Sequence, residues 1–293
     1  MTKLRTVCAV AVLVAGIACG GQQPAGQPPV PVRLYVLDGG TLHVTDPSRF
    51  QLKKDEVAEL NLSVGCYLVT HPRGTLLWDT CAVPDSEWTY AGSPVKHHLV
   101  LPDKQERDFT LVKPLTMQLA DAGHSRVTIT RLALSHYHYD HTANANLFPK
   151  AVWLVTDLER EAMFAVPPPR VTTRPSTYEG LRNGGVIRIT GDDHDVFGDG
   201  TVVIKAARGH TEGHQVLYVK LARTGGVVLA GDLYHYPEER TLDRVPTFEF
   251  DAQQTRAARK SLDRFLDETK SQLWIQHDFN AHAKLKKAPE YYD

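Results

Sequence analysis

Three histidines and one aspartate fall within six consecutive positions of the segment SHYHYDHTAN, residues 135–144. The segment follows the apolar run VTITRLAL, which has the composition of a β-strand. If that strand continues to the first histidine, His136 and His138 point to the same side, because side chains alternate along a strand. Burying such groups without partners is strongly unfavourable. The pattern therefore predicts metal ligands, with His136 and His138 on one ion and Asp140 and His141 facing a second.

Three more candidate ligands each follow an apolar run of their own. His210 follows TVVIKAARG, Asp232 follows GVVLAG, and His277 follows QLWIQ. Strand ends are positions at which a rigid scaffold can direct side chains to a common site. Each ion would have three protein ligands if Asp232 bridges the two, and a shared water would then become a nucleophile at neutral pH. A single histidine such as His277 is more often a core or surface residue, so it is predicted only as a member of the set.

The first thirty residues differ from the rest of the chain. Lys3 and Arg5 precede an apolar run at 6–18 that is too short to span a bilayer but is typical of a secretory signal. The expected domains are a signal peptide at 1–19, a flexible Gly/Gln/Pro linker at 20–31 and one globular domain at 32–293. A buried N-terminal helix is the alternative, and it would leave Arg5 without a packing context.

The same leader bears on location. Cys19 is preceded by small residues and followed by the flexible linker, which resembles a bacterial lipoprotein signal with Cys19 acylated. An ordinary signal-peptidase site is the other interpretation. Either way we expect an exported protein that is periplasmic or lipid-anchored to the cell envelope, with the lipid on Cys19 as its sole membrane contact.

Composition limits the partners of the chain. Lys and Arg number 33 against 34 Asp and Glu, which gives a formal net charge of -1. A chain without a basic surplus has no electrostatic reason to bind nucleic acid or an anionic membrane surface. A small molecule is therefore the expected partner.

Short β-branched runs recur from Arg33 onward and predict a domain rich in sheet. Most of them are expected to be strands: RLYVLDGGTLHV, GCYLVT, TLLWDT, RVTITRLALS, AVWLVT, GVIRIT, TVVIKAA, HQVLYVKLA and GVVLAGD. Glycine-containing segments separate these runs and predict hairpin turns. These segments are 39–40, 72–74, 198–200 and 224–226.

Three segments have the pattern of helices: 251–269, the segment that begins at Thr156, and 113–122. Asp251 with Gln254, and Thr156 with Glu159, have the spacing of capping boxes. The longest helix has an apolar stripe formed by Ala257, Leu262, Phe265 and Leu266. Strands interspersed with helices, ending in strand–helix–strand, predict an α/β domain with a two-layered sheet core flanked by helices.

Two long stretches, 83–112 and 166–184, are rich in Pro and aromatic residues and are expected to be irregular. Loops of this length tend to be lids or binding walls. A surface excursion or an oligomer contact, such as a homodimer interface, is the alternative.

Two cysteines, Cys66 and Cys81, remain outside the leader. They flank the predicted hairpin around 72–74 in roughly diagonal positions. A disulfide would need a bulge or a strand end to bring the two Cα atoms within range. Two free thiols in the core are the other interpretation.

The ordered motifs of the chain resemble those of the metallo-β-lactamase superfamily. They are HYHYDH, GHTEGH, AGD, LLWDT and the late QHD. The resemblance implies a four-layer αβ/βα sandwich and a hydrolase domain over 32–293. It further implies His136, His138 and His210 on the first ion, Asp140, His141 and His277 on the second, and Asp232 between them.

Other positions of the motifs carry weaker implications. Asp79 would support the loops of the site rather than bind metal, and His214 would orient a ligand or merely begin the next strand. Cys81 stands where a glycine usually follows the Asp-Thr pair.

Within that superfamily, RLYVLDGGTL, GCYLVTHPRGTLLWDT, VPTFEFD and the PEYY ending most resemble N-acyl homoserine lactonases. The resemblance implies lactone opening, and so quorum quenching, by a metal-bridging hydroxide, with Asp140 carrying the proton to the leaving oxygen. A tyrosine three residues after the bridging aspartate would donate to the substrate carbonyl. Here that position is His235, between Tyr234 and Tyr236, so we expect Tyr236 to take the role if the loop has one extra residue, and His235 otherwise.

Other functions fit the same ligands. One is another binuclear hydrolase, either a thioesterase of the glyoxalase II kind or an aryl- or phosphotriesterase. A non-catalytic metal-binding surface lipoprotein is a second. Two divalent ions are expected in each case, with zinc favoured and iron, manganese or cobalt also compatible with His and Asp ligands.

Overall fold

A computed structural model describes residues 31–88, 94–101, 104–168 and 172–293. It contains an eight-stranded sheet in the order β4-β5-β1-β2-β3-β6-β7-β8 and a five-stranded sheet in the order β13-β12-β11-β10-β9. The larger sheet consists of β1 (Arg33–His43), β2 (Leu62–His71), β3 (Gly74–Trp78), β4 (Val95–Val100), β5 (Glu106–Leu111), β6 (Arg131–Ala133), β7 (Val152–Thr156) and β8 (Val186–Ile189). The smaller consists of β9 (Asp193–Asp195), β10 (Val202–Ala206), β11 (Gln215–Leu221), β12 (Gly225–Leu229) and β13 (Gln272–Trp274).

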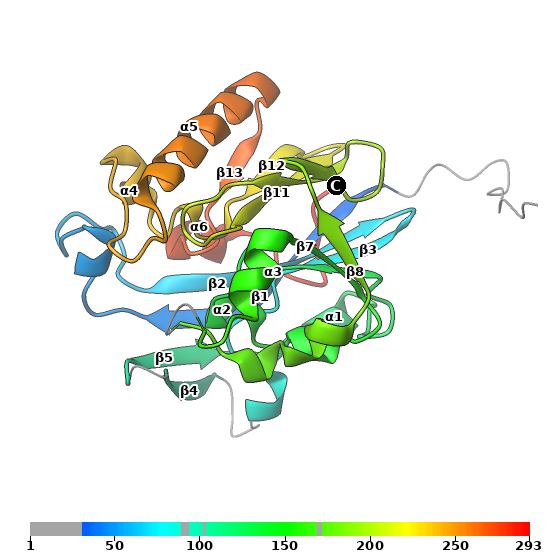
Figure 1. The fold of residues 1–293 in the computed structure, drawn as a ribbon, viewed down its shortest axis with the longest axis horizontal. Helices are drawn as coiled ribbons and strands as arrows, with labels where there is room; N and C mark the ends of the chain where they lie inside the picture. Colours follow the sequence, from blue (N-terminus) through cyan, green and yellow to red (C-terminus); the bar gives the residue numbers. More distant parts are fainter. Residues whose placement is uncertain (1–30, 89–93, 102–103, 169–171) are drawn as a thin grey trace, which may run out of the picture.

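Helices lie on the outer faces of the two sheets (Figure 1). The α-helices are α1 (Leu115–Asp121), α2 (Tyr139–Thr142), α3 (Asp157–Met163), α4 (Pro237–Thr241), α5 (Ala252–Thr269) and α6 (Phe279–Lys284). Short 3-10 helices are η1 (Ser48–Phe50), η2 (Asp85–Glu87), η3 (Ala145–Leu147), η4 (Pro175–Thr177), η5 (Glu179–Asn183) and η6 (Gly231–Leu233).

Three apolar clusters separate the layers. Buried side chains such as Val36 and Val69 of the larger sheet meet Ile204 and Leu217 of the smaller one between the sheets. On the outer face of the larger sheet, α1 and the end of α3 cover a second cluster. On the outer face of the smaller sheet, α5 covers a third with Leu262. The order helix–sheet–sheet–helix confirms the predicted four-layer αβ/βα sandwich.

Each apolar run predicted as a strand contributes one, but the turns were only partly predicted. The turns at 72–74, 198–200 and 224–226 join antiparallel pairs as expected. The turn predicted at 39–40 is wrong, because β1 continues through both glycines with a register shift between Asp38 and Thr41. Gly40 has φ of 100°, a conformation that glycine adopts without a steric penalty, so the pair marks a bulge and not a hairpin.

The two long stretches expected to be irregular differ from each other. Within 83–112, β4 and β5 form an antiparallel pair, so that prediction is wrong for this part. Both strands carry mostly charged or imidazole side chains on the exposed face, which hid the strand pattern in the sequence. The described part of 166–184 contains only 3-10 turns.

The expected signal peptide, Cys19 and nearly all of the linker lie outside the described residues. No helix among the described residues is long and apolar enough to cross a membrane.

The predicted helices form, with two corrections. Asp251 caps α5 by accepting from the N–H groups of Gln253 and Gln254, but Ala257 is exposed, and the buried stripe consists of Thr255, Arg259, Leu262 and Leu266. Thr156 caps α3 as predicted. The Glu159 side chain does not return to the cap. It points inward, where its Oε2 accepts from Thr211 Oγ1 at 2.8 Å and from the Gly213 N–H at 2.9 Å.

Cys66 and Cys81 form a disulfide with Cα atoms 5.5 Å apart. The bridge is sterically accessible because β3 ends at Trp78 and Cys81 lies beyond the strand end, one of the two conditions stated above. The alternative of two free thiols is therefore set aside.

We predict that Gly213→Ala destabilises the fold. A Cβ at Gly213 would lie 2.5 Å from Glu159 N and 2.7 Å from Glu159 Cβ, so the 210–214 segment would have to move away from α3. Overpacking of this kind costs about 1–3 kcal/mol. Thermal unfolding should show a lower Tm for Gly213→Ala. Gly185→Ala is the matched control, since its nearest contact is Val152 Cγ2 at 3.8 Å. Equal Tm values for both variants would contradict the close approach.

A second prediction concerns pH. Burial raises the pKa of the Glu159 carboxyl from 4.5 to about 8. A raised pKa in the folded state means that this group favours folding most below pH 4.5 and loses that contribution as pH rises toward 8. Relative to Glu159→Gln, the parent should therefore lose stability across this window. Denaturant unfolding at several pH values measures the difference, and Glu161→Gln at an exposed position of α3 should show no such trend.

Candidate metal centre

The segment that opens the site is not a strand where the sequence predicted one. β6 ends at Ala133, and residues 134–138 are irregular before α2 begins at Tyr139. The segment is fixed instead by Asp79, whose Oδ1 accepts from the Ser135 N–H at 2.6 Å. His136 and His138 still face one site, but the loop geometry and not strand alternation brings them together.

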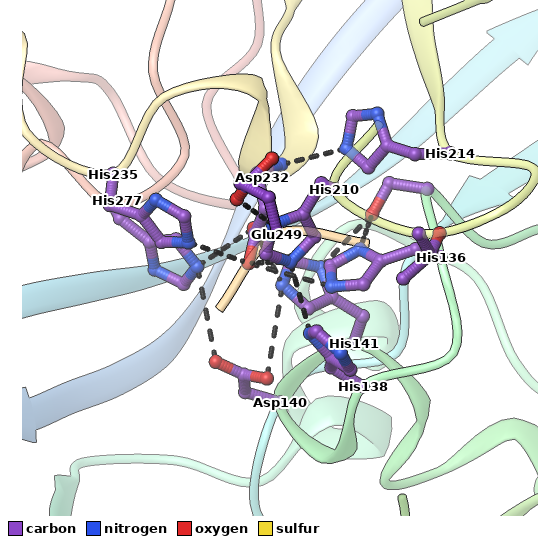
Figure 2. A network of polar contacts seen from close by, with 12 residues as sticks. His136, His138, Asp140, His141, His210, His214, Asp232, His235, Glu249 and His277 are labelled. Carbon is purple, nitrogen blue, oxygen red and sulfur yellow. Dashed lines mark hydrogen bonds and ion pairs between the residues drawn. The ribbon is translucent and has the colours of Figure 1, made fainter. Parts of the chain in front are cut away.

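The other ligands come from the smaller sheet. β10 and β12 are both antiparallel to β11, so they run in the same direction. β13 is parallel to β12 and shares that direction. The carboxyl ends of these three strands therefore meet at one edge of the sheet, followed by His210, Asp232 and His277. Figure 2 shows all seven predicted ligands turned toward a common centre. They form two groups: His136, His138, His210 and Asp232, and Asp140, His141 and His277.

Asp232 faces both groups at once. Its Oδ2 lies 3.4 Å from His136 Nε2 and 3.3 Å from His210 Nε2. Its Oδ1 lies 3.0 Å from His141 Nε2 and 3.0 Å from His277 Nε2. One carboxylate thus spans the two ligand sets, which is the position predicted for a bridging ligand.

Hydrogen bonds at the far side of the rings set their orientation. His141 Nδ1 lies 2.9 Å from Asp79 Oδ2, His210 Nδ1 lies 2.8 Å from Glu249 Oε1, and His277 Nδ1 donates to the Ser63 carbonyl at 2.7 Å. Carboxylate and carbonyl acceptors of this kind hold a proton on Nδ1 and leave Nε2 available to a metal.

The donor atoms at the centre fit divalent metal ions. The Nε2 atoms of His136, His141 and His277 and the Oδ1 atom of Asp232 are buried and make no hydrogen bond. All seven residues are at most 7% exposed. Buried polar atoms without partners are strongly unfavourable, whereas imidazole nitrogens and carboxylate oxygens converging on one point are typical metal ligands. These residues therefore form a binuclear site for divalent metals.

The charges of the site are strongly coupled. Burial opposes ionisation of Asp232, but His141 and His277 hold the pKa of its carboxyl well below the ordinary range. Burial also opposes protonation of His210, yet the Glu249 and Asp232 carboxylates raise the pKa of its imidazole to about 9. The carboxylates thus give the centre a negative potential, which favours a divalent cation in place of the protons on the imidazoles.

His214 lies behind the ligands. Its Nε2 accepts from the Asp232 N–H at 3.0 Å, and its Nδ1 donates to the Ala207 carbonyl at 2.9 Å. Burial lowers the pKa of this imidazole to about 4, so the ring is neutral and one nitrogen can accept. His214 thereby fixes the main chain at the bridging aspartate.

His235 and Tyr236 occupy different environments. His235 lines the pocket above the ligands, with Nε2 3.2 Å from Asp232 Oδ2 and Nδ1 3.2 Å from Glu239 Oε1. Tyr236 is 2% exposed and its hydroxyl donates to the Leu60 carbonyl at 2.6 Å. The hydroxyl of Tyr236 is therefore turned away from the ligands, whereas His235 lines the pocket beside them.

Glu249 was missed by sequence reasoning as a residue of the site. Its Oε1 contacts His210 Nδ1, and its Oε2 accepts from Thr255 Oγ1 at 2.5 Å. It lies in the motif TFEFD, where nothing in the local pattern distinguishes it from a surface carboxylate. Only the tertiary contact with His210 reveals it.

A small pocket of about 70 Å³ opens onto the centre. Four ligands form its base: His138, Asp140, Asp232 and His277. Its walls combine the apolar Leu42, Phe50, Leu62 and Phe248 with the guanidinium groups of Arg49 and Arg107. The pocket can therefore take a compact polar ring at the metals and an apolar substituent along the wall.

Comparison with known proteins agrees with this geometry. The chain is 26% identical over 283 residues to the N-acyl homoserine lactonase AttM of Azorhizobium caulinodans, covering 89% of this chain and 99% of that protein. A solved N-acyl homoserine lactone hydrolase with N-hexanoyl-L-homoserine at its catalytic metal centre matches with a TM-score of 0.71 and 23% identity, over 88% of this chain and 98% of that one. The dizinc quorum-quenching lactonase AidC matches with a TM-score of 0.61 and 18% identity, over 89% and 94%.

These two structures share the fold described above. The family profile of the metallo-beta-lactamase superfamily matches residues 61–270, a range that contains six of the seven ligands, all except His277. The chain belongs to the metallo-β-lactamase superfamily.

Proposed function

We propose that this protein is a binuclear metal-dependent hydrolase that opens the ring of N-acyl homoserine lactones. The observation that carries the proposal is the Asp232 carboxylate, which spans two buried ligand sets at the base of a pocket. Relatives named N-acyl homoserine lactonases align with this chain over 98–99% of their own length in the AttM group. The alignment includes the whole hydrolase domain, and this supports an activity shared by this chain and those lactonases.

The pocket supports a lactone with an acyl arm. A five-membered ring is compact enough for a cavity of about 70 Å³ beside the metals. Phe50 and Phe248 are in edge contact, with ring centroids 5.4 Å apart, and offer an apolar wall to an alkyl chain. Arg107 and Arg49 both donate to Gln105 Oε1, at 2.5 and 2.8 Å, which holds these two cations together at the wall of the pocket.

The chemistry requires a polarised carbonyl and an activated water, which two divalent ions supply when bound. Asp140 contributes a base. Its Oδ1 and Oδ2 lie 4.0 Å from His141 Nε2 and 3.9 Å from His277 Nε2, and its carboxylate lines the pocket. An oxygen of Asp140 can take the proton of the attacking water and return it to the ring oxygen as the ester bond breaks.

His235 contributes a donor. Its ring stacks on that of His277 with an interplanar angle of 3°, and Phe50 packs against it with centroids 4.9 Å apart. Glu239, held in turn by Arg259, lies at Nδ1. This support fixes the ring with Nε2 beside Asp232 Oδ2 in the pocket lining, where its N–H can be shared with a substrate oxygen.

Zinc is the metal we propose, since His and Asp ligands suit it and AidC, which has the same fold, is a dizinc lactonase.

We also propose that the protein is exported, with acylation of Cys19 as its anchor. The Cys66–Cys81 disulfide supports export, because disulfides persist in oxidising compartments.

Metal removal tests the proposed activity. Protein treated with a strong chelator should lose its activity. When Zn²⁺ is added back, it should bind two equivalents and regain ring opening of N-hexanoyl homoserine lactone, followed as acid release.

Asp140→Asn should lower kcat by about 100-fold or more, because the base is lost. S-lactoylglutathione and an aryl phosphotriester serve as competing substrates. Faster hydrolysis of either one than of the lactone would reject the proposed substrate.

A pair of variants tests the donor. His235→Phe keeps an aromatic ring against His277 but removes the N–H, and kcat should fall by about 10-fold or more at unchanged zinc content. Tyr236→Phe removes a hydroxyl that contacts Leu60, so kcat should change by less than about threefold while Tm falls. The opposite ranking of the two kcat values would return the role to Tyr236.

A further inference from the structure

The turn that follows β3 is conformationally unusual. Asp79 has φ of 59° and Cys81 has φ of 62°, both in the left-handed region. Residues with a Cβ rarely adopt this conformation, and glycine is the residue that does so freely. Cys81 is also the position at which the family motif usually has glycine. The turn therefore needs an external contact to hold this conformation.

This turn holds a metal ligand. Asp79 Oδ2 lies 2.9 Å from His141 Nδ1, while the Thr80 N–H and hydroxyl both donate to the His141 carbonyl, at 2.8 and 3.0 Å. The Cys81 carbonyl accepts from the Ala143 N–H at 3.1 Å. Asp79 thus fixes the side chain of His141 and Thr80 fixes its main chain, while Cys81 holds Ala143 two residues further on.

The disulfide connects the turn to the interior of the larger sheet. Cys66 is in β2, is fully buried and pairs with Leu37 of β1. A Cβ at Gly39 of β1 would lie 2.9 Å from Cys81 Cβ, so β1 also packs tightly on the turn. Cys81 is only 4% exposed, so the bridge that ties the turn to β2 is buried.

We propose that the Cys66–Cys81 disulfide is a positioning element of the metal centre. It holds the Asp79–Cys81 turn in the left-handed conformation that directs Asp79 and Thr80 to His141. It thereby sets the affinity of the second ligand set, Asp140, His141 and His277, for its ion. In this chain the bridge maintains at position 81 a conformation that a glycine would adopt without a steric penalty.

Formation of the bridge follows ordinary exchange chemistry. The Cys66 and Cys81 thiols lose two protons and two electrons as the S–S bond forms, and a disulfide oxidant such as oxidised glutathione is reduced to two thiols. The inference does not depend on the substrate, because it concerns metal binding alone.

Peptide mapping without reductant tests whether the bridge is present. Trypsin cuts after Arg73, between the two cysteines, so an intact bridge should join peptide 55–73 to peptide 74–96. Reduction should separate them. Two separate peptides before reduction would overturn the proposal.

Two double variants test its role. Cys66→Ala/Cys81→Ala removes the bridge and leaves a Cβ at the left-handed position, whereas Cys66→Ala/Cys81→Gly removes the bridge but supplies glycine. Competition with a chromogenic zinc chelator gives the affinity for each of the two ions. We expect the alanine variant to bind the second Zn²⁺ about 10–100-fold more weakly, as for loss of a group that orients a ligand. The loss for the first ion should be smaller, since Asp79 reaches its ligands His136 and His138 only through the Ser135 N–H.

The glycine variant separates positioning from stability. Both variants lack the bridge, so both should have a lower Tm than the parent. If the bridge positions His141, the glycine variant should recover most of the affinity for the second ion while its Tm stays low. Equal zinc affinities in the parent and the alanine variant, or equal losses in both variants, would show that the bridge contributes only to global stability. If the alanine variant is insoluble, Cys66→Ala alone takes its place and the same comparison holds.

Discussion

The rest of the structure depends on one buried carboxylate, that of Asp232, which must remain charged between two sets of imidazoles. Its oxygens lie 3.0–3.4 Å from the Nε2 atoms of five histidines. Such a group is stable in a protein interior only if cations or proton donors surround it on every side. Both sheets serve this requirement, because the ligands on one side follow β6 and those on the other follow β10, β12 and β13.

Much of this site could be predicted from sequence, since the ligands follow apolar runs. The order of residues within such a segment is enough to identify them. What could not be predicted depends on contacts between distant segments. Glu249 is recognisable only by its distance to His210. Tyr236 and His235 were alternatives for the pocket, and the Leu60 carbonyl, 176 residues away in the chain, holds the Tyr236 hydroxyl elsewhere. A pattern of residue types specifies which groups exist, while packing decides where each one points.

The fold shows the same limit. The apolar alternation of the central strands marked them correctly, because one or both faces are buried. β4 and β5 escaped prediction since their side chains are largely exposed and polar, and the strand conformation is maintained by pairing with β1 and with each other. At Gly39–Gly40 the residues typical of a turn form a bulge, because β2 pairs with β1 on both sides of the glycines and β5 pairs with the part after them.

The two departures of this chain from the family motif differ in kind. His235, where the resemblance implies a tyrosine, lines the pocket, and the surrounding Phe50, Glu239 and His277 hold its ring in position. Cys81 in place of glycine changes nothing in the pocket, yet it alters how the conformation of a supporting turn is maintained. Glycine allows a left-handed turn by removing a steric conflict, whereas a disulfide imposes it by a covalent link to β2. The second solution requires an oxidising environment during folding, so the geometry of the metal centre and the compartment in which the chain folds are constrained together.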